Sequence, residues 1–313
     1  MTERRETGRG RSKRQTSPSR NRQGNGPKPP SRPTSWEEGD RIAKYLAHAG
    51  VCSRRDAEVL IEEGAVTVNG QRLDSPAFKV SSRDVIKVRG EIVRPPEASR
   101  VWLYHKPAGL ITATRDPEGR ATIFEHLPKS LPRVVTIGRL DLTTEGLLLL
   151  TNDGELARQM ELPSTGLERH YRARAHGVVT PEALASLAEG VTVDGMTYAP
   201  IEAVLERTTG TNNWLSVTLH EGKNREVRKA LASVGLTVNR LIRTRYGPFE
   251  LGDLASGTLT ELSSKDIQGL RDAGIETGRM KAPKGQSKDR KALAGDPRKR
   301  VHTARKRRNL SRK

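Results

Sequence analysis

Apolar residues recur with two periodicities along the chain, and these periodicities distinguish the expected helices from the expected strands. Helical spacing, with apolar positions three or four residues apart, predicts short helices over 41–48 and 54–63. Alternation of apolar and polar residues predicts half-buried strands over 168–175 and 214–219. The continuous apolar run 147–150 is too short to span a membrane and has the length of a buried strand.

Capping and turn residues indicate where these elements begin and end. Asp40 and Ser53 are expected to cap the first two helices, because short oxygen-bearing side chains satisfy the free amides of a helix start. Thr180, followed by proline, indicates the start of another helix, and 154–161 also has a helical pattern. Asn69, followed by glycine, is the strongest short signal for a hairpin turn.

The order of these elements divides the chain into modules. Two short helices followed by a small sheet predict a module over 39–92, and Pro95-Pro96 indicates a stiff linker after it. Over 100–265, strands joined mostly by hairpins are interrupted by single helices. This order predicts an α+β fold with a mixed or antiparallel sheet flanked by helices.

Positive charge is concentrated at the two ends of the chain, whose 313 residues have a net charge of +19. Residues 1–34 carry ten Lys and Arg against two acidic residues, and 277–313 carry fifteen against two, which leaves 35–276 at −2. Both ends are poor in apolar residues, so we expect disordered basic arms over 1–38 and 277–313. Such arms favour a polyanionic partner.

Several classes of chemistry find no support in the sequence. Cys52 is the single cysteine, which excludes an intramolecular disulfide. Neither a GxxxxGK[ST] loop nor a GxGxxG turn occurs, and the seven histidines lack the paired spacing of a metal site, so we expect no metal and no cofactor. The lack of a long apolar stretch predicts a cytoplasmic protein that does not bind membranes, and we expect it to be a monomer.

A stretch near the middle of the chain carries the main candidate for chemistry. Residues 138–154 begin with Arg139 and Asp141 two positions apart, which would place both side chains on one face of an extended strand. A Thr-Thr-Glu-Gly turn follows and leads into the apolar run. A carboxylate beside an arginine at the end of a buried strand suits catalysis, but a turn-capping aspartate and a surface arginine would give the same local pattern.

The N-terminal module has an unusual pair of cations and resembles a known RNA-binding module. Arg54 and Arg55 occupy the first turn of the second helix, where the helix dipole disfavours cations, so an external anion is expected to hold these charges. The segments 41–46, 50–57 and 61–70 together resemble the alpha-L RNA-binding motif, which also occurs in ribosomal small-subunit protein four. This resemblance implies RNA binding through Lys44, Arg54 and Arg55, with backbone phosphates as their contacts.

Three motifs follow one another in the second module. They are Gly138-Arg139-Leu140-Asp141 with its continuation to Gly154, His170-Tyr171-Arg172-Ala173, and Asn224-Arg225-Glu226-Val227-Arg228. In this order they resemble the pseudouridine synthases, and in particular the bacterial ribosomal large subunit pseudouridine synthase B type. The resemblance implies that Asp141 is the catalytic carboxylate, that Tyr171 stacks on the substrate base, and that Arg228 pairs with the aspartate.

Pseudouridine formation suits a site built from ordinary side chains. The reaction breaks the N1–C1′ bond of a uridine and rejoins the uracil through C5, so it is redox-neutral. An ionised Asp141 can act as the nucleophile, toward either the sugar or the base, and a cation such as Arg228 keeps a buried carboxylate charged. The uridine must be flipped out of the folded RNA, and the resemblance implies that Arg139 fills the vacated position in the stack.

Ribosomal RNA is the expected partner. Four further arginines are expected phosphate contacts: Arg115, Arg120, Arg243 and Arg245. The run 115–124 is closer to the large-subunit enzymes, which favours 23S rRNA or a precursor particle and leaves small-subunit RNA open. A non-catalytic RNA-binding or ribosome-assembly factor would explain the first module and the arms equally well, but it would have no use for Asp141 near phosphates. No helix has the pattern of a major-groove reader, which disfavours DNA.

Overall fold

The computed structural model describes residues 39–81, 83–263, 266–267, 270 and 275. The basic arms expected at the two ends therefore lie outside the described residues. Within the described part of the chain, no helix is both long enough and apolar enough to cross a membrane.

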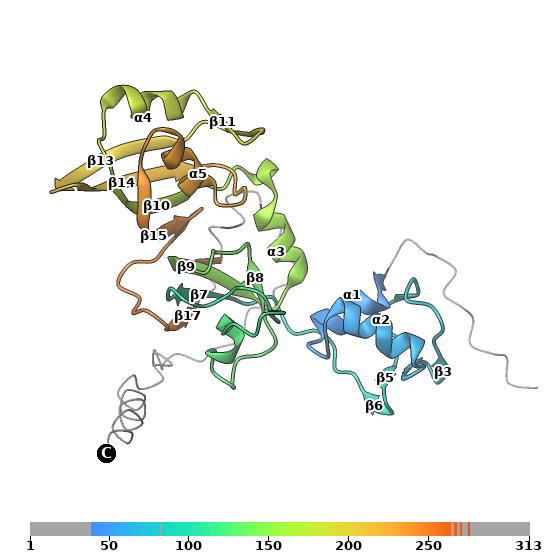
Figure 1. Cartoon of the computed structure of the whole chain (residues 1–313). Coiled ribbons are helices and arrows are strands. Elements are labelled where there is room, and N and C mark those ends of the chain that lie inside the picture. The colour runs from blue at the N-terminus through green and yellow to red at the C-terminus, as the bar shows by residue number, and fades with distance from the viewer. Residues whose placement is uncertain (1–38, 82, 264–265, 268–269, 271–274, 276–313) are drawn as a thin grey trace, which may run out of the picture. The chain divides into compact units, whose positions relative to one another are not determined.

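Residues 40–92 form a pair of helices with short strands (Figure 1). The elements are β1 (Asp40–Arg41), α1 (Ile42–His48), α2 (Arg54–Glu62), β2 (Val66–Val68), β3 (Gln71–Arg72), β4 (Lys79–Val80), β5 (Ile86–Val88) and β6 (Glu91–Ile92). Strands β3, β2, β5 and β6 form one antiparallel sheet in that order, and β1 pairs with β4. Ile42 and Leu46 of α1, Ala57 of α2 and Val66 of β2 are fully buried in a common core.

The expected start of α2 and the expected hairpin turn are both confirmed. Ser53 Oγ accepts a hydrogen bond from the Asp56 amide at 3.1 Å, and the Asp56 carboxylate accepts one from the Ser53 amide at 3.3 Å, so the two residues form a capping box. Asn69 and Gly70 have φ angles of 51° and 81°, the left-handed conformation that a tight hairpin turn requires.

The expected cap at Asp40 is wrong. Helix α1 begins after Arg41, whose side chain makes no capping hydrogen bond. Asp40 belongs to β1, where it is paired with Val80, and its carboxylate forms an ion pair with Lys44 at 2.8 Å. Strand pairing has therefore placed Asp40 one residue too early to cap the helix.

A nine-stranded mixed sheet organises residues 101–261. Its elements and their neighbours are β7 (Val101–Lys106), η1 (Ile123–Glu125), β8 (Val135–Ile137), β9 (Thr144–Thr151), α3 (Gly154–Glu161), η2 (Pro163–Thr165), β10 (Arg169–His176), α4 (Pro181–Ala188), β11 (Val191–Val193), β12 (Met196–Tyr198), β13 (Glu202–Thr209), β14 (Asn212–Leu219), α5 (Glu226–Ser233), β15 (Thr237–Tyr246), β16 (Phe249–Glu250) and β17 (Leu259–Glu261). The sheet runs in the order β13-β14-β10-β15-β9-β7-β17, with β8 beside β9 and β16 beside β15, while β11 and β12 form a separate hairpin. All neighbouring pairs are antiparallel except β9 with β15, so the expected α+β fold with a mixed sheet is confirmed.

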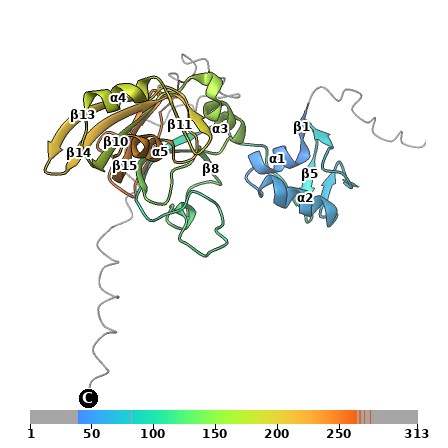
Figure 2. The same ribbon diagram turned by 45° about the horizontal axis from the view of Figure 1, so that its top comes forward.

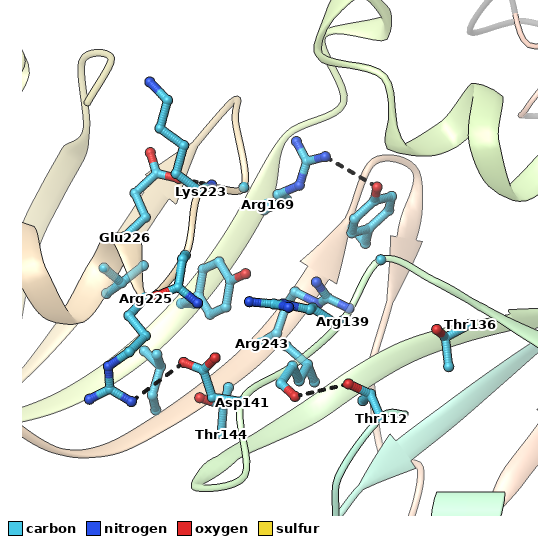
Figure 3. A pocket seen from close by; sticks show the side chains of 18 of the residues that line it. Thr112, Thr136, Arg139, Asp141, Thr144, Arg169, Lys223, Arg225, Glu226 and Arg243 are labelled. Atoms are coloured by element: carbon cyan, nitrogen blue, oxygen red, sulfur yellow. Dashed lines mark hydrogen bonds and ion pairs between the residues drawn. The ribbon is translucent and has the colours of Figure 1, made fainter. Parts of the chain in front are cut away.

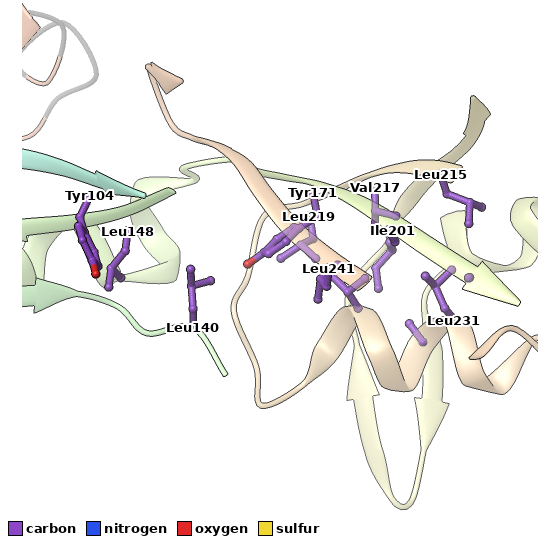
Figure 4. Close-up of a cluster of buried hydrophobic side chains, with 14 of the residues drawn as sticks. Tyr104, Leu140, Leu148, Tyr171, Ile201, Leu215, Val217, Leu219, Leu231 and Leu241 are labelled. Carbon is purple, nitrogen blue, oxygen red and sulfur yellow. The ribbon is translucent and has the colours of Figure 1, made fainter. Parts of the chain in front are cut away.

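Strand β9 is buried on both faces, as its apolar run predicts. Leu148 and Leu150 belong to the larger hydrophobic cluster, part of which Figure 4 shows. Leu147 and Leu149 belong to a second cluster on the opposite face. All four side chains are fully buried, which makes β9 a rigid support for the loop that precedes it.

Helices cover both faces of the sheet. Leu187 of α4 and Leu231 of α5 pack in the larger cluster with Leu215 of β14, so both helices lie on the same face (Figures 1 and 2). Leu156 and Met160 of α3 pack in the second cluster, against the other face of β9. The predicted cap of α4 is confirmed, because Thr180 Oγ1 accepts a hydrogen bond from the Ala183 amide at 3.2 Å.

Candidate active site

Asp141 lies in the loop 138–143, which forms one wall of a cleft of about 1060 Å³. The expectation that Arg139 and Asp141 share one face of a strand is wrong, because β9 begins only at Thr144. The loop is closed by a turn in which the Thr144 amide donates to the Asp141 carbonyl at 3.0 Å, and its Leu142 carbonyl accepts from the Gly109 amide at 2.8 Å. Its residues therefore bond to a turn and to another loop, and they belong to no strand. The Asp141 side chain remains 25% exposed and lines the cleft.

The ammonium group of Lys106 holds this loop through hydrogen bonds to its backbone carbonyls. Lys106 ends β7 and is fully buried, and its Nζ donates to the carbonyls of Thr144 at 2.8 Å, Pro107 at 3.0 Å and Asp141 at 3.1 Å. Burial lowers the pKa of Lys106 to about 8, and the negative charges of Asp141 and Glu145 oppose this shift. Sequence reasoning missed this residue, because a buried lysine at the end of a strand has the same pattern as an exposed one.

Asp141 is paired with Arg225 and not, as expected, with Arg228. Arg225 Nη1 lies 3.9 Å from Asp141 Oδ2 (Figure 3), and the backbone of Arg225 at the start of α5 has a φ of 53°, which is strained for an arginine. Arg228 donates to the carbonyls of Val238 at 3.0 Å and Thr143 at 3.4 Å. Burial and the neighbouring Arg225 lower the pKa of the Arg228 guanidinium, while Asp141 opposes the shift, so Arg228 remains electrostatically coupled to the carboxylate. Their sequence spacing could not distinguish the two arginines, because both are in the same motif.

Tyr171 lines the same cleft as Asp141, although the two residues come from different parts of the sheet. It lies on β10, is 9% exposed, and pairs in register with Val217 of β14 and Arg243 of β15. Figure 4 shows its ring among the side chains of the larger hydrophobic cluster, close to Leu219. The ring is therefore held by packing on one side, while the residue also borders the cleft.

Four arginines line the cleft in addition to Arg225: Arg120, Arg139, Arg169 and Arg243, and Figure 3 labels the last three. Arg139 is exposed, whereas Arg169 and Arg243 are only 6% and 2% exposed. Arg139 and Arg243 were expected from the sequence, whereas Arg169 was not. The alternation along β10 could have found it, because Arg169 is two residues from Tyr171 and therefore on the same face.

The other expected RNA contacts are distributed over several surfaces. Arg120 lines the cleft and binds Asp116 through two hydrogen bonds, at 2.8 and 2.9 Å. Arg115, in the same loop, does not line it. Arg245 lines a second, smaller cleft on the other face of β10 and β15, so the structure does not bring it together with Asp141. In the N-terminal module, Arg54 and Arg55 are exposed in the first turn of α2, and Lys44 is the α1 residue paired with Asp40.

A pair of glutamates lies next to Arg225, and sequence reasoning missed it. Glu226 is 4% exposed and accepts a hydrogen bond from the Lys223 amide at 2.8 Å. Burial, together with the nearby charge of Glu221, raises the pKa of Glu226 to about 7. Glu221 is itself paired with the Lys223 ammonium at 2.8 Å. Where the chain is described, no group of three His, Cys, Asp or Glu side chains could hold a metal ion.

Comparisons with known proteins agree with this architecture. The family described as RNA pseudouridylate synthase matches residues 100–233, and the S4 domain matches residues 40–86. An uncharacterized RNA pseudouridine synthase of Rickettsia bellii is 50% identical over 225 residues, which cover 72% of this chain and 97% of that protein. Ribosomal large subunit pseudouridine synthase B of Pseudomonas aeruginosa is 41% identical over 273 residues, covering 82% of this chain and 70% of that protein. A crystal structure of a pseudouridylate synthase superposes with a TM-score of 0.53 at 27% identity, covering 74% of this chain and 99% of that one.

The match to the RNA pseudouridylate synthase family, together with the S4 domain, shows that the chain is an RNA-modifying isomerase. The chain belongs to the RNA pseudouridine synthases, in the group that includes ribosomal large subunit pseudouridine synthase B and carries an N-terminal S4 domain. The resemblance seen in the sequence motifs is therefore confirmed for the family and for the enzyme class.

Proposed function

We propose that this enzyme converts a specific uridine of large-subunit (23S) rRNA into pseudouridine. The observation that carries the proposal is that Asp141 and Tyr171 border one cleft, whose remaining walls hold five arginines. The relatives named for the large-subunit reaction are about 40% identical over most of the chain, which supports the choice of RNA. A carboxylate surrounded by cations fits a reaction at a nucleotide whose phosphates those cations hold.

The proposed reaction uses Asp141 as the nucleophile. Its carboxylate forms a bond to the ribose C1′ or to the uracil, the N1–C1′ bond breaks, and the uracil turns. C5 then bonds to C1′, and the bond to Asp141 breaks, which returns the free carboxylate. The C5 proton is then lost and N1 regains a proton, so the product is an isomer of the substrate. Arg225 at 3.9 Å stabilises the ionised carboxylate, and Arg228 contributes through its charge. Tyr171 offers the uracil a flat face, and we assign its hydroxyl a part in moving the C5 proton.

Two parts of the chain are proposed to place the RNA: Arg139 in the catalytic module and the N-terminal module. We propose that the uridine is flipped into the cleft and that the exposed Arg139 takes its place in the stack. The module over 39–92 then sets the position on the RNA through Lys44, Arg54 and Arg55. The catalytic module extends over 100–265.

The proposal is tested by mapping pseudouridines in both ribosomal RNAs from cells with and without the gene. We expect one large-subunit site to disappear when the gene is deleted and to return with the wild-type gene. Asp141→Asn should not restore it, although the variant protein should bind an rRNA fragment at least as tightly, because one negative charge has gone from a phosphate-binding cleft. Asp253→Asn, an exposed aspartate outside the cleft, serves as the control and should restore the site. Loss of a small-subunit site would show that the substrate is small-subunit rRNA instead. Restoration of the site by Asp141→Asn would contradict the proposal.

A further inference from the structure

Two buried arginines flank one tyrosine on a wall of the cleft. The guanidinium carbons of Arg169 and Arg243 lie 4.9 and 5.0 Å from the centre of the Tyr246 ring. Arg169 starts β10, and Arg243 and Tyr246 lie on β15, where Arg169 and Tyr246 are paired in register. All three residues line the cleft, and none of them is more than 6% exposed. This cluster is therefore built into the sheet.

The cluster has hydrogen-bond partners for only part of its donors. Arg169 donates to the carbonyls of Leu167 at 2.8 Å and His220 at 2.9 Å, and to the Tyr246 hydroxyl at 3.2 Å. Arg243 donates through Nε to the Leu147 carbonyl at 2.7 Å, but its Nη2 is buried and has no hydrogen-bond partner. A buried donor without an acceptor costs about 1–3 kcal/mol, and more on a charged group. The unsatisfied Nη2 therefore indicates a missing acceptor.

The cluster also lacks a negative charge. Among the described residues, no carboxylate oxygen lies within 4.0 Å of a guanidinium nitrogen of Arg169 or Arg243. Glu161 also lines the cleft, but its carboxylate accepts a hydrogen bond from the Gly138 amide at 2.6 Å. Buried cations in proteins are normally paired, because removing a charge from water costs several kcal/mol. Two unpaired guanidinium groups in one cleft wall point to an anion that the ligand supplies.

We propose that Arg169 and Arg243 form a phosphate subsite that holds a phosphodiester next to the flipped uridine. The inference rests on the proposed function, since it uses the same cleft and the same RNA. Arg243 is paired in register with Tyr171, so a nucleotide stacked on that tyrosine has its own backbone phosphates beside the cluster. A guanidinium presents parallel donors that match the oxygens of a phosphate, and the arginine charge does not depend on pH in the physiological range.

The subsite has a positioning role. A phosphate fixed on Arg169 and Arg243 would hold the ribose of the same nucleotide against Asp141, which lies in the same cleft. Fixing a substrate next to the reacting group lowers the entropic part of the barrier. Asp141 has Arg225 as its cation, so the phosphate and the carboxylate do not compete for one guanidinium.

The test replaces single phosphates of the RNA by neutral methylphosphonates. The substrate is an rRNA fragment that contains the mapped uridine, with the substitution on its 5′ side, on its 3′ side or four nucleotides away. For the wild-type enzyme, one of the two flanking substitutions should lower kcat/KM by about tenfold or more, the effect of losing a charge-assisted hydrogen bond, and the distant one should not. For Arg243→Gln and Arg169→Gln, the same flanking substitution should cause almost no further loss, because the contact is already gone.

Matched variants separate this role from a structural one. Arg174 lies on the opposite, exposed face of β10. The Arg174→Gln enzyme should therefore keep the full sensitivity to the flanking methylphosphonate. Arg243→Lys keeps the charge and should restore part of the sensitivity to the flanking methylphosphonate. Circular dichroism should show that each variant is folded. If the glutamine variants do not fold, the kcat/KM values of the wild-type enzyme on the three modified RNAs decide whether the phosphate subsite exists. Equal rates on all three modified RNAs would overturn the subsite while leaving the proposed function standing, whereas the absence of pseudouridine on unmodified RNA would refute the proposed function itself.

Discussion

Lys106→Met tests how the Asp141 loop is held. The substitution keeps most of the apolar length of the side chain and removes the ammonium that donates to the carbonyls of Pro107, Asp141 and Thr144. Each carbonyl that loses its donor costs about 1–3 kcal/mol, and relief of the buried charge offsets part of that cost. We expect the variant to be less stable than the wild type by roughly 2 kcal/mol at pH 7, and its turnover to fall because the Asp141 loop is no longer fixed.

The pH dependence of the free energy of unfolding gives a more specific prediction for Lys106. Burial lowers the pKa of Lys106 from 10.5 to about 8. Below pH 8 the folded and unfolded chains both hold the proton. Between the two pKa values the unfolded chain binds more protons than the folded chain, so the free energy of unfolding rises with pH. A gap of about 2.5 units, at about 1.4 kcal/mol per unit, corresponds to a rise of about 3 kcal/mol that only a chain with Lys106 can show.

Urea unfolding of the wild type and Lys106→Met at several pH values between 7 and 10.5 measures this rise. Other groups titrate in the same range, but they are common to both proteins and cancel in the difference. The stability difference should widen in favour of the wild type as the pH increases. Lys129→Met, an exposed lysine in the same domain, should show no such widening. A difference that stays constant across the range would refute the argument that the Lys106 ammonium is held in a desolvated site.

Three further predictions concern the glutamate pair, the N-terminal module and the C-terminal arm. Glu226→Gln should stabilise the protein much more at pH 8 than at pH 5, because a carboxylate whose pKa is raised from 4.5 to about 7 loses stability as the pH rises through that interval and carries the full cost above it; equal effects at both pH values in thermal unfolding would contradict this. Arg54→Gln combined with Arg55→Gln should raise KM for an rRNA fragment more than it lowers kcat and leave the melting temperature unchanged, and a clear loss of stability would indicate a structural role instead. Deleting residues 277–313 should weaken RNA binding and flatten the slope of log affinity against log salt, which filter binding measures; an unchanged slope would exclude the arm from binding.

Much of the fold could be predicted because local patterns and tertiary structure agree. The alternation over 168–175 and 214–219 became β10 and β14, and the helix expected over 154–161 matches α3. Thr180 and Ser53 cap their helices as their chemistry requires. These features depend on neighbours within a few residues, which is the range that sequence reasoning covers.

The errors occurred where distant residues decide the local structure. Asp40 was expected to cap a helix, but pairing with a strand 40 residues later moved it into β1. The alternation of Arg139 and Asp141 resembles a strand, yet the Lys106 ammonium takes up the backbone carbonyls of this segment and holds it as a loop. The choice between Arg225 and Arg228 as the partner of Asp141 likewise depends on how α5 approaches the loop, and no pattern within the motif records that approach.

Among the strands that the structure describes, the one parallel pair joins the strand that follows the Asp141 loop to the strand that carries Arg243. Strands β9 and β15 are parallel over three residue pairs, of which the last is Arg243 with Gly146. A side chain at Gly146 would place its Cβ 2.3 Å from the Arg243 carbonyl oxygen, and its φ of 103° also favours glycine. The two backbones can therefore approach closely just after the loop that carries Asp141. As a result, the carboxylate and the buried arginine are related through two adjacent strands and not through mobile side chains. This fixed spacing suits the reaction proposed above, because sugar and phosphate would stay in place while the uracil turns.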